Sequence, residues 1–146
     1  MSAGPYEPPK SVVRDAPAEP VERPRQVGLA AKCLWASIGI GGILLVLDYR
    51  FIAGASSAAT AWIVPAAVLG LLALFTAAIS VGRNWARIVF LVLFVIGALP
   101  YFAVLAEMFA RSKLTASLSV IQLLLQAAAM YLVFTKPGSA WFRRQA

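Results

Sequence analysis

Residues 88–110 read IVFLVLFVIGALPYFAVLAEMFA, a stretch in which Glu107 is the one charged residue. A helix needs about 20 apolar residues to cross the ~30 Å hydrocarbon core of a bilayer. Lipid offers the backbone no hydrogen-bonding partner, and an unbroken apolar run lacks the alternation of a barrel strand. The stretch therefore predicts a transmembrane helix. Three further apolar stretches of similar length lie at 29–47, 58–81 and 117–135.

Composition agrees with a membrane protein. The chain has 146 residues, of which 61% are hydrophobic and 13% charged, whereas soluble domains carry about 25% charged residues. The net charge of +7 is spread between apolar runs and does not form a patch of the kind that binds nucleic acid. The lipid bilayer is the expected partner, and no nucleic acid is expected.

Three regions follow from these patterns. Residues 1–28 are rich in proline and charge, which predicts a disordered cytoplasmic tail. Residues 29–135 are expected to form an all-α bundle of four transmembrane helices with short connections, so that neighbouring helices pair as antiparallel hairpins. Residues 136–146 are expected to be a short basic cytoplasmic tail. The spacing of Pro17 and Pro20 leaves open whether the first tail binds a partner in polyproline conformation or is only solvated.

The distribution of Lys and Arg predicts the orientation, because cytoplasmic loops carry an excess of both. Eight of these residues lie on the side of the N-terminus and three on the opposite side, which places both termini in the cytoplasm. The eight are Arg23, Arg25, Lys32, Arg83, Arg87, Lys136, Arg143 and Arg144, and the three are Arg50, Arg111 and Lys113.

Rings and cations at the expected cytoplasmic boundary predict interfacial anchors. These anchors are Trp35, Arg83, Trp85, Arg87, Trp141, Arg143 and Arg144. Residues 82–87 and 138–143 share the pattern G-x-x-W-x-R. The pattern has two explanations, a duplicated helical hairpin or the ordinary chemistry of a membrane boundary.

Polar or helix-breaking residues within apolar runs are the candidates for function. Gln122 and Gln126 lie one turn apart, and they could contact a substrate or only bond neighbouring helices. Pro100 removes a backbone donor and should kink its helix. Glu107 and Asp48 lie near outer helix ends close to arginines, a position that favours interfacial ion pairs over a proton-transfer role.

Small residues four positions apart let helix backbones approach closely. Ser37 and Gly41 have this spacing in the first helix, and Ala66 and Gly70 have it in the second. We expect both pairs to mark contacts within the bundle or between subunits.

The sequence predicts no catalytic, cofactor-binding or metal-binding residues. It has no histidine, and Cys33 is its one cysteine. No paired carboxylates lie at mid-membrane, and no Gly-rich phosphate loop is present. These features favour a protein that is not an enzyme and has no cofactor.

Two boundary segments carry a resemblance. Residues 82–88 (GRNWARI) and 131–142 (YLVFTKPGSAWF) resemble small uncharacterised bacterial inner-membrane proteins with four helices. The resemblance covers roughly residues 30–142, and it implies a multi-pass protein of the bacterial inner membrane. It implies no activity.

The functional hypothesis is an accessory or regulatory subunit, or an oligomeric structural subunit, that contacts another membrane protein or a second copy of itself. The alternative is a small oligomeric transporter or channel, with Gln122, Gln126, Glu107 and Pro100 along its path. An enzyme acting on lipid is the third possibility. It would need carboxylates or amides clustered at one interface, and Asp48 and Glu107 far apart would exclude it.

Overall fold

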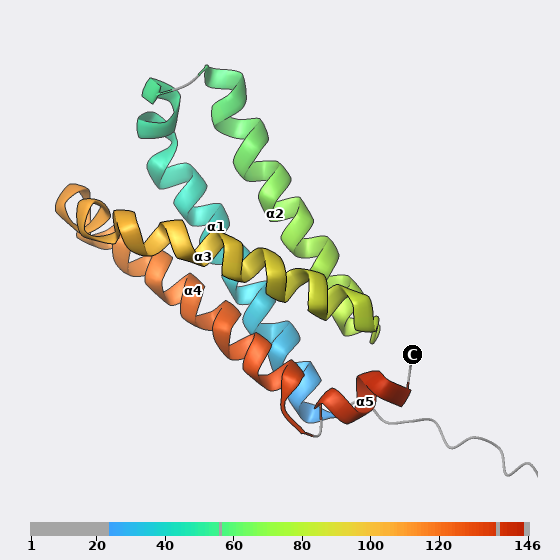
Figure 1. Cartoon of the computed structure of the whole chain (residues 1–146). Coiled ribbons are helices and arrows are strands. Elements are labelled where there is room, and N and C mark those ends of the chain that lie inside the picture. The colour runs from blue at the N-terminus through green and yellow to red at the C-terminus, as the bar shows by residue number, and fades with distance from the viewer. Residues whose placement is uncertain (1–23, 56, 137, 145–146) are drawn as a thin grey trace, which may run out of the picture.

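The structure, a computed structural model, describes residues 24–55, 57–136 and 138–144, and these residues contain no strand. They form four long helices and a short one (Figure 1). Each long helix is long and apolar enough to cross a membrane, which confirms the predicted all-α, multi-pass architecture. The helices are α1 (Arg25–Ala55), α2 (Ala58–Ser80), α3 (Asn84–Arg111), α4 (Lys113–Phe134) and α5 (Gly138–Arg144).

Polar caps determine where two of the helices begin. The Ser57 hydroxyl accepts a hydrogen bond from the Thr60 amide at 3.3 Å and caps α2. Ser112 caps α4 in the same way through the Thr115 amide, so α4 begins at Lys113 and not at residue 117.

Helical structure also enters the two predicted tails. The first tail lies outside the described residues up to residue 23, and α1 already begins at Arg25. The basic segment 136–146 contains α5.

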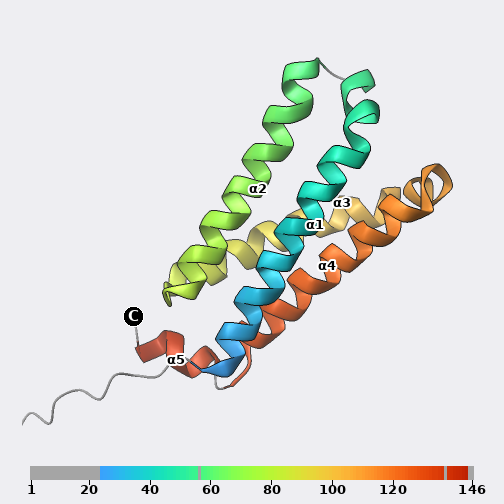
Figure 2. The same cartoon turned by 180° about the vertical axis from the view of Figure 1, so that it is seen from behind.

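Two antiparallel hairpins, α1–α2 and α3–α4, build the bundle (Figure 1). Helix α1 packs most extensively along α4, so the first and last long helices lie side by side. Helices α2 and α3 diverge from the turn at 81–83, as the view from behind also shows (Figure 2). These two helices therefore meet mainly near their turn and do not form the full-length hairpin expected of neighbours.

Small residues explain the close approach of α1 to its neighbours. Ser37 is fully buried and Gly41 is buried. A Cβ atom on Gly41 would lie 2.6 Å from the Leu69 Cδ2 atom of α2 and 3.0 Å from the Gln122 Nε2 atom of α4. Gly41 is thus the point where three helices come together.

The buried core lies at one end of the bundle, which we call the closed end. There α1 and α3 begin, α2 and α4 end, and α5 packs across. Within α3 the buried residues are Ala86, Arg87 and Phe90, all near its start. The core cluster consists of Val27, Ala30, Leu34, Leu72, Phe75, Ile79, Ala86, Phe90, Ala129, Met130, Val133, Trp141 and Phe142.

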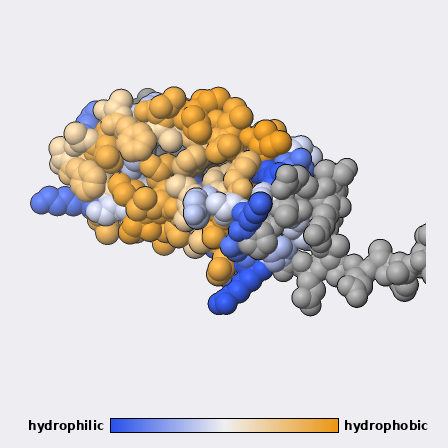
Figure 3. Space-filling view, turned by 60° about the horizontal axis from the view of Figure 1, so that its bottom comes forward, coloured by the Kyte–Doolittle hydropathy of each residue, from blue (hydrophilic) through white to orange (hydrophobic). Residues whose placement is uncertain are grey.

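The outer surface is suited to lipid. Apolar side chains cover most of the middle of the face seen in Figure 3, and the most hydrophilic side chains project near its ends. Large exposed residues such as Ile96, Leu99 and Phe102 continue this surface along α3. The bundle thus exposes apolar side chains of the kind that a soluble protein buries in its core, and these can face the lipid of a bilayer.

A tight turn at Gly82 links α2 to α3 at the closed end. Gly82 has φ +89°, a left-handed conformation that residues with a Cβ adopt at a cost. The Trp141 ring of α5 lies over this glycine, so a Cβ there would come within 2.7 Å of its Cη2 atom. Both the conformation of the turn and the packing of α5 on it therefore require a glycine at position 82.

We expect Gly82→Ala to lower the free energy of unfolding by about 2–4 kcal/mol, because it combines backbone strain with overpacking. Thermal unfolding of the purified protein in mild detergent measures the change. The matched control is Gly28→Ala, since a Cβ on Gly28 meets nothing within 4 Å. A Gly82→Ala variant as stable as the control would contradict the packing of Trp141 on this turn.

Candidate functional site

A cavity of about 530 Å³ lies between α2, α3 and α4, and we call it the central pocket. It forms where α2 and α3 diverge, and residues of α4 line its remaining side. Its apolar and small lining residues are Val68, Leu71, Leu72, Phe75, Phe90, Leu93, Phe94, Gly97, Ala98, Met108 and Leu123, and its polar ones are Tyr101, Ser119, Gln122 and Gln126.

Helix α4 supplies most of the polar wall of this pocket. Ser119, Gln122 and Gln126 follow one another at spacings of three and four, so they share a helix face. The Ser119 hydroxyl donates to the Thr115 carbonyl at 2.9 Å and is thereby satisfied. Neither glutamine side chain forms a hydrogen bond with any other described residue. Their amide groups are available to a ligand.

Tyr101 adds a polar group from α3. Its hydroxyl oxygen is buried and has no hydrogen-bonding partner within the described part of the chain. Ser119 is its polar neighbour in the pocket, although the two do not reach hydrogen-bond geometry. An unsatisfied hydroxyl is expensive in an apolar setting. The pocket thus offers a donor that its own residues do not use.

A second, smaller cavity of about 330 Å³ lies between α1, α2 and α4. Gly41, Asp48 and Pro65 are among the residues that line it. Val68 and Gln122 line both cavities, so these two side chains separate them.

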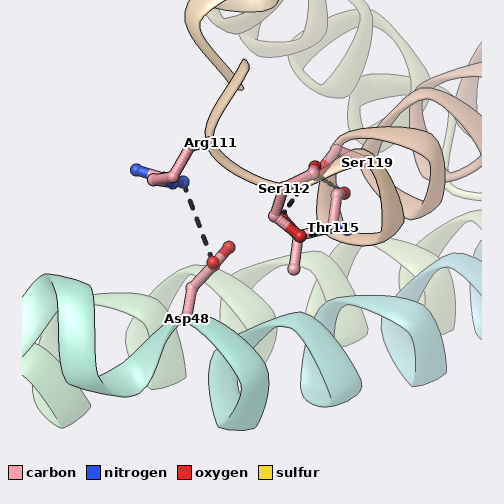
Figure 4. Close-up of polar contacts among 5 residues, drawn as sticks. All are labelled: Asp48, Arg111, Ser112, Thr115 and Ser119. Atoms are coloured by element: carbon pink, nitrogen blue, oxygen red, sulfur yellow. Dashed lines mark hydrogen bonds and ion pairs between the residues drawn. The ribbon is translucent and has the colours of Figure 1, made fainter. Parts of the chain in front are cut away.

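Asp48 of α1 pairs with Arg111, the last residue of α3, at the end of the bundle opposite the core (Figure 4). The carboxylate Oδ1 lies 3.7 Å from the guanidinium Nη2. Nearby, the Tyr49 and Trp62 rings stack with centroids 4.7 Å apart and join α1 to α2. These two contacts join α1 to α3 and to α2 at the end of the bundle that is farthest from the buried core.

Because the Asp48 and Arg111 side chains are 20% and 33% exposed, we expect the pair to contribute only about 0.2–1 kcal/mol to stability. A double-mutant cycle with Asp48→Asn and Arg111→Gln, read by thermal unfolding in detergent, measures this coupling energy. Strictly additive single effects would show that the two side chains do not interact.

At the closed end Arg87 faces two aromatic rings. Its Cζ atom lies 5.2 Å from the centroid of Phe134 and 4.8 Å from that of Phe142. The side chain is 8% exposed, whereas that of Arg83 is exposed. Cation–π contacts of a desolvated guanidinium are each worth about 2 kcal/mol. Arg87 thus links α3, α4 and α5 inside the protein, which differs from the lipid contact expected of an anchor.

The remaining predicted anchors are divided between surface and interior. Trp35 and Trp85 are about half exposed, as suits an interfacial ring, while Trp141 is buried over Gly82. The backbones of Arg143 and Arg144 belong to α5, and their side chains lie outside the described atoms. The two G-x-x-W-x-R segments lie in contact but differ in structure, because Gly82 forms a turn and Gly138 begins a helix.

The four residues proposed for a transport path do not all meet. Gln122 and Gln126 line the central pocket, whereas Glu107 and Pro100 are exposed and do not. Helix α3 continues through Pro100, and the pocket is lined by Gly97, Ala98 and Tyr101 in its place.

The small-residue pairs also differ. Ser37 and Gly41 face the interior of the bundle, but Ala66 and Gly70 lie on the exposed face of α2. A Cβ on Gly70 would meet nothing within 4 Å.

Sequence reasoning did not identify Tyr101 or the aromatic lining of the pocket. Phe75, Phe90 and Phe94 resemble any other apolar residue in a transmembrane run, and only the tilt of α3 brings them together. One signal was available, since Tyr101 is a polar ring within the long apolar stretch 88–110.

Within residues 24–55, 57–136 and 138–144 no group of three or more His, Cys, Asp or Glu side chains could hold a metal ion. Comparisons with known protein families, curated proteins and solved structures found no match.

Proposed function

We propose that this chain is a non-enzymatic accessory or oligomeric subunit of the bacterial inner membrane, with both termini in the cytoplasm. It acts by packing against another membrane protein or a second copy of itself. The observation that carries the proposal is the unused small-residue face of α2.

In lipid, helices associate by close van der Waals packing, because lipid tails are as apolar as the side chains they would replace. The Ser37 and Gly41 pair is used for this purpose inside the bundle. The Ala66 and Gly70 pair has the same spacing and is left exposed. A face of small residues favours contact with a helix over contact with lipid, and so supports an intermolecular role.

We expect Gly70→Leu, alone and with Ala66→Leu, to weaken association about tenfold or more, because leucine holds the partner backbone away. Native-membrane cross-linking followed by sizing in mild detergent measures the change. Gly39→Leu is the matched control, since Gly39 is also an exposed helical glycine with no neighbour within 4 Å of its Cβ position. A wild-type protein that is monomeric and traps no neighbour would refute the proposal.

The proposed orientation has its own test in cells. In a Cys33→Ser background, we expect Ser57→Cys to react with a membrane-impermeant thiol reagent and Lys136→Cys to react only after the cells are opened. Both side chains are exposed and lie at opposite ends of the bundle. The reverse labelling pattern would place the termini outside, against the distribution of Lys and Arg.

A transporter or channel is less well supported. It relies on Gln122 at the boundary between the two cavities, but neither Glu107 nor Pro100 reaches them.

A further inference from the structure

The central pocket has the dimensions and position of a ligand site entered from the bilayer. Its volume of about 530 Å³ falls within the range of about 300–1,000 Å³ that is usual for small-molecule sites. Val68 and Leu71 of α2 and Leu93 of α3 line it and are also exposed, so the pocket opens on the surface between the diverging helices (Figures 1 and 2). A molecule dissolved in lipid can enter there without crossing water.

The charge of the lining excludes an ionic ligand. None of the described residues that line the pocket is Asp, Glu, Lys or Arg. A phosphate or carboxylate buried without a cation would bear a large desolvation cost. In addition, Gln122 and Gln126 lie near the middle of α4 (Lys113–Phe134), a depth that a phospholipid headgroup does not reach. The occupant is therefore uncharged and has its polar atoms at mid-membrane.

The polar groups of the pocket define which atoms that occupant presents. The Gln126 amide has N–H groups that form no hydrogen bond with described residues, and the Tyr101 hydroxyl is buried and has no hydrogen-bonding partner among them. Both can donate a hydrogen bond, whereas the Gln122 Nε2 atom packs beside Gly41 of α1. Donors on two facing helices, α3 and α4, suit a ligand with more than one carbonyl oxygen.

Aromatic side chains define its shape. Phe75, Phe90 and Phe94 line the pocket with Tyr101, and the Phe75 and Phe90 rings lie 6.0 Å apart at an interplanar angle of 47°. Of these phenylalanines Phe94 is the nearest to Tyr101 along α3, about two turns away, so its ring can contact a flat ligand ring held by Tyr101. The exposed aliphatic rim leaves an exit for a long apolar tail.

We propose that the central pocket binds a lipid-soluble quinone, with its ring between α3 and α4, its carbonyl oxygens accepting from Tyr101 and Gln126, and its tail leaving between α2 and α3. This inference does not depend on the proposed subunit role, because the pocket lies on a different face of α2 from Ala66 and Gly70.

The test is a titration of the purified protein in phospholipid nanodiscs with decyl-ubiquinone, followed by quenching of tryptophan fluorescence. Trp85 contacts the pocket residue Phe75 edge-on, with centroids 6.1 Å apart, and serves as the reporter. We expect saturable quenching in the wild type. We expect Tyr101→Phe and Gln126→Leu to weaken binding about threefold each and about tenfold together, from the modest strength of hydrogen bonds in membranes.

Two controls separate this site from a nonspecific apolar crevice. Tyr131→Phe removes the same hydroxyl from an exposed position on α4 and should leave binding unchanged. Decylbenzene has a ring and a tail but no carbonyl, and should not displace the quinone. Equal binding by wild type and the Tyr101→Phe/Gln126→Leu variant, or full displacement by decylbenzene, would overturn the proposal. Thermal unfolding of the double variant near the wild-type value would show that the pocket itself is intact. Gln122 is left unchanged because it packs against Gly41.

Discussion

The contact of Arg87 with Phe134 and Phe142 holds together the end of the bundle on which the remaining arrangement depends. In a bilayer no hydrophobic effect pushes helices together, so association relies on close packing and on a few strong local contacts. Arg87 supplies such a contact between α3, α4 and α5. At the same end of the bundle the Trp141 ring of α5 packs over Gly82 in the α2–α3 turn. The guanidinium is retained inside the protein because two aromatic faces replace part of its hydration.

The central pocket forms because the bundle is closely packed mainly at the closed end. Phe75, Phe90 and Trp85 place bulky rings beside the α2–α3 turn, and the two helices diverge beyond it (Figures 1 and 2). Helix α3 therefore leans toward α4, and a cavity is left between them and α2. At the opposite end the Asp48 and Arg111 pair joins α1 to α3.

Apolar run length was sufficient to predict the four long helices, because a bilayer imposes one length and one hydrogen-bonding pattern on each span. Helix ends were less predictable: α2 begins at Ala58 as its apolar stretch does, but α4 begins four residues before its stretch because Ser112 caps it through a hydrogen bond that hydropathy ignores. The site was predictable only in part. Gln122 and Gln126 stand out as polar residues, but Arg83 and Arg87 look alike in sequence, and only the rotation of α3 buries the second. The same holds for Gly41 and Gly70, whose roles depend on which helix lies opposite.

The position of α5 in the chain has a consequence for biogenesis. Trp141 and Phe142 belong to the buried core, yet they follow all four long helices in sequence. Chains are synthesised from the N-terminus, so these two rings leave the ribosome after the four long helices. Until then Arg87 has only one of its two aromatic neighbours, and Gly82 is uncovered. The closed end is therefore completed only when α5, which follows the four long helices in the chain, docks on it.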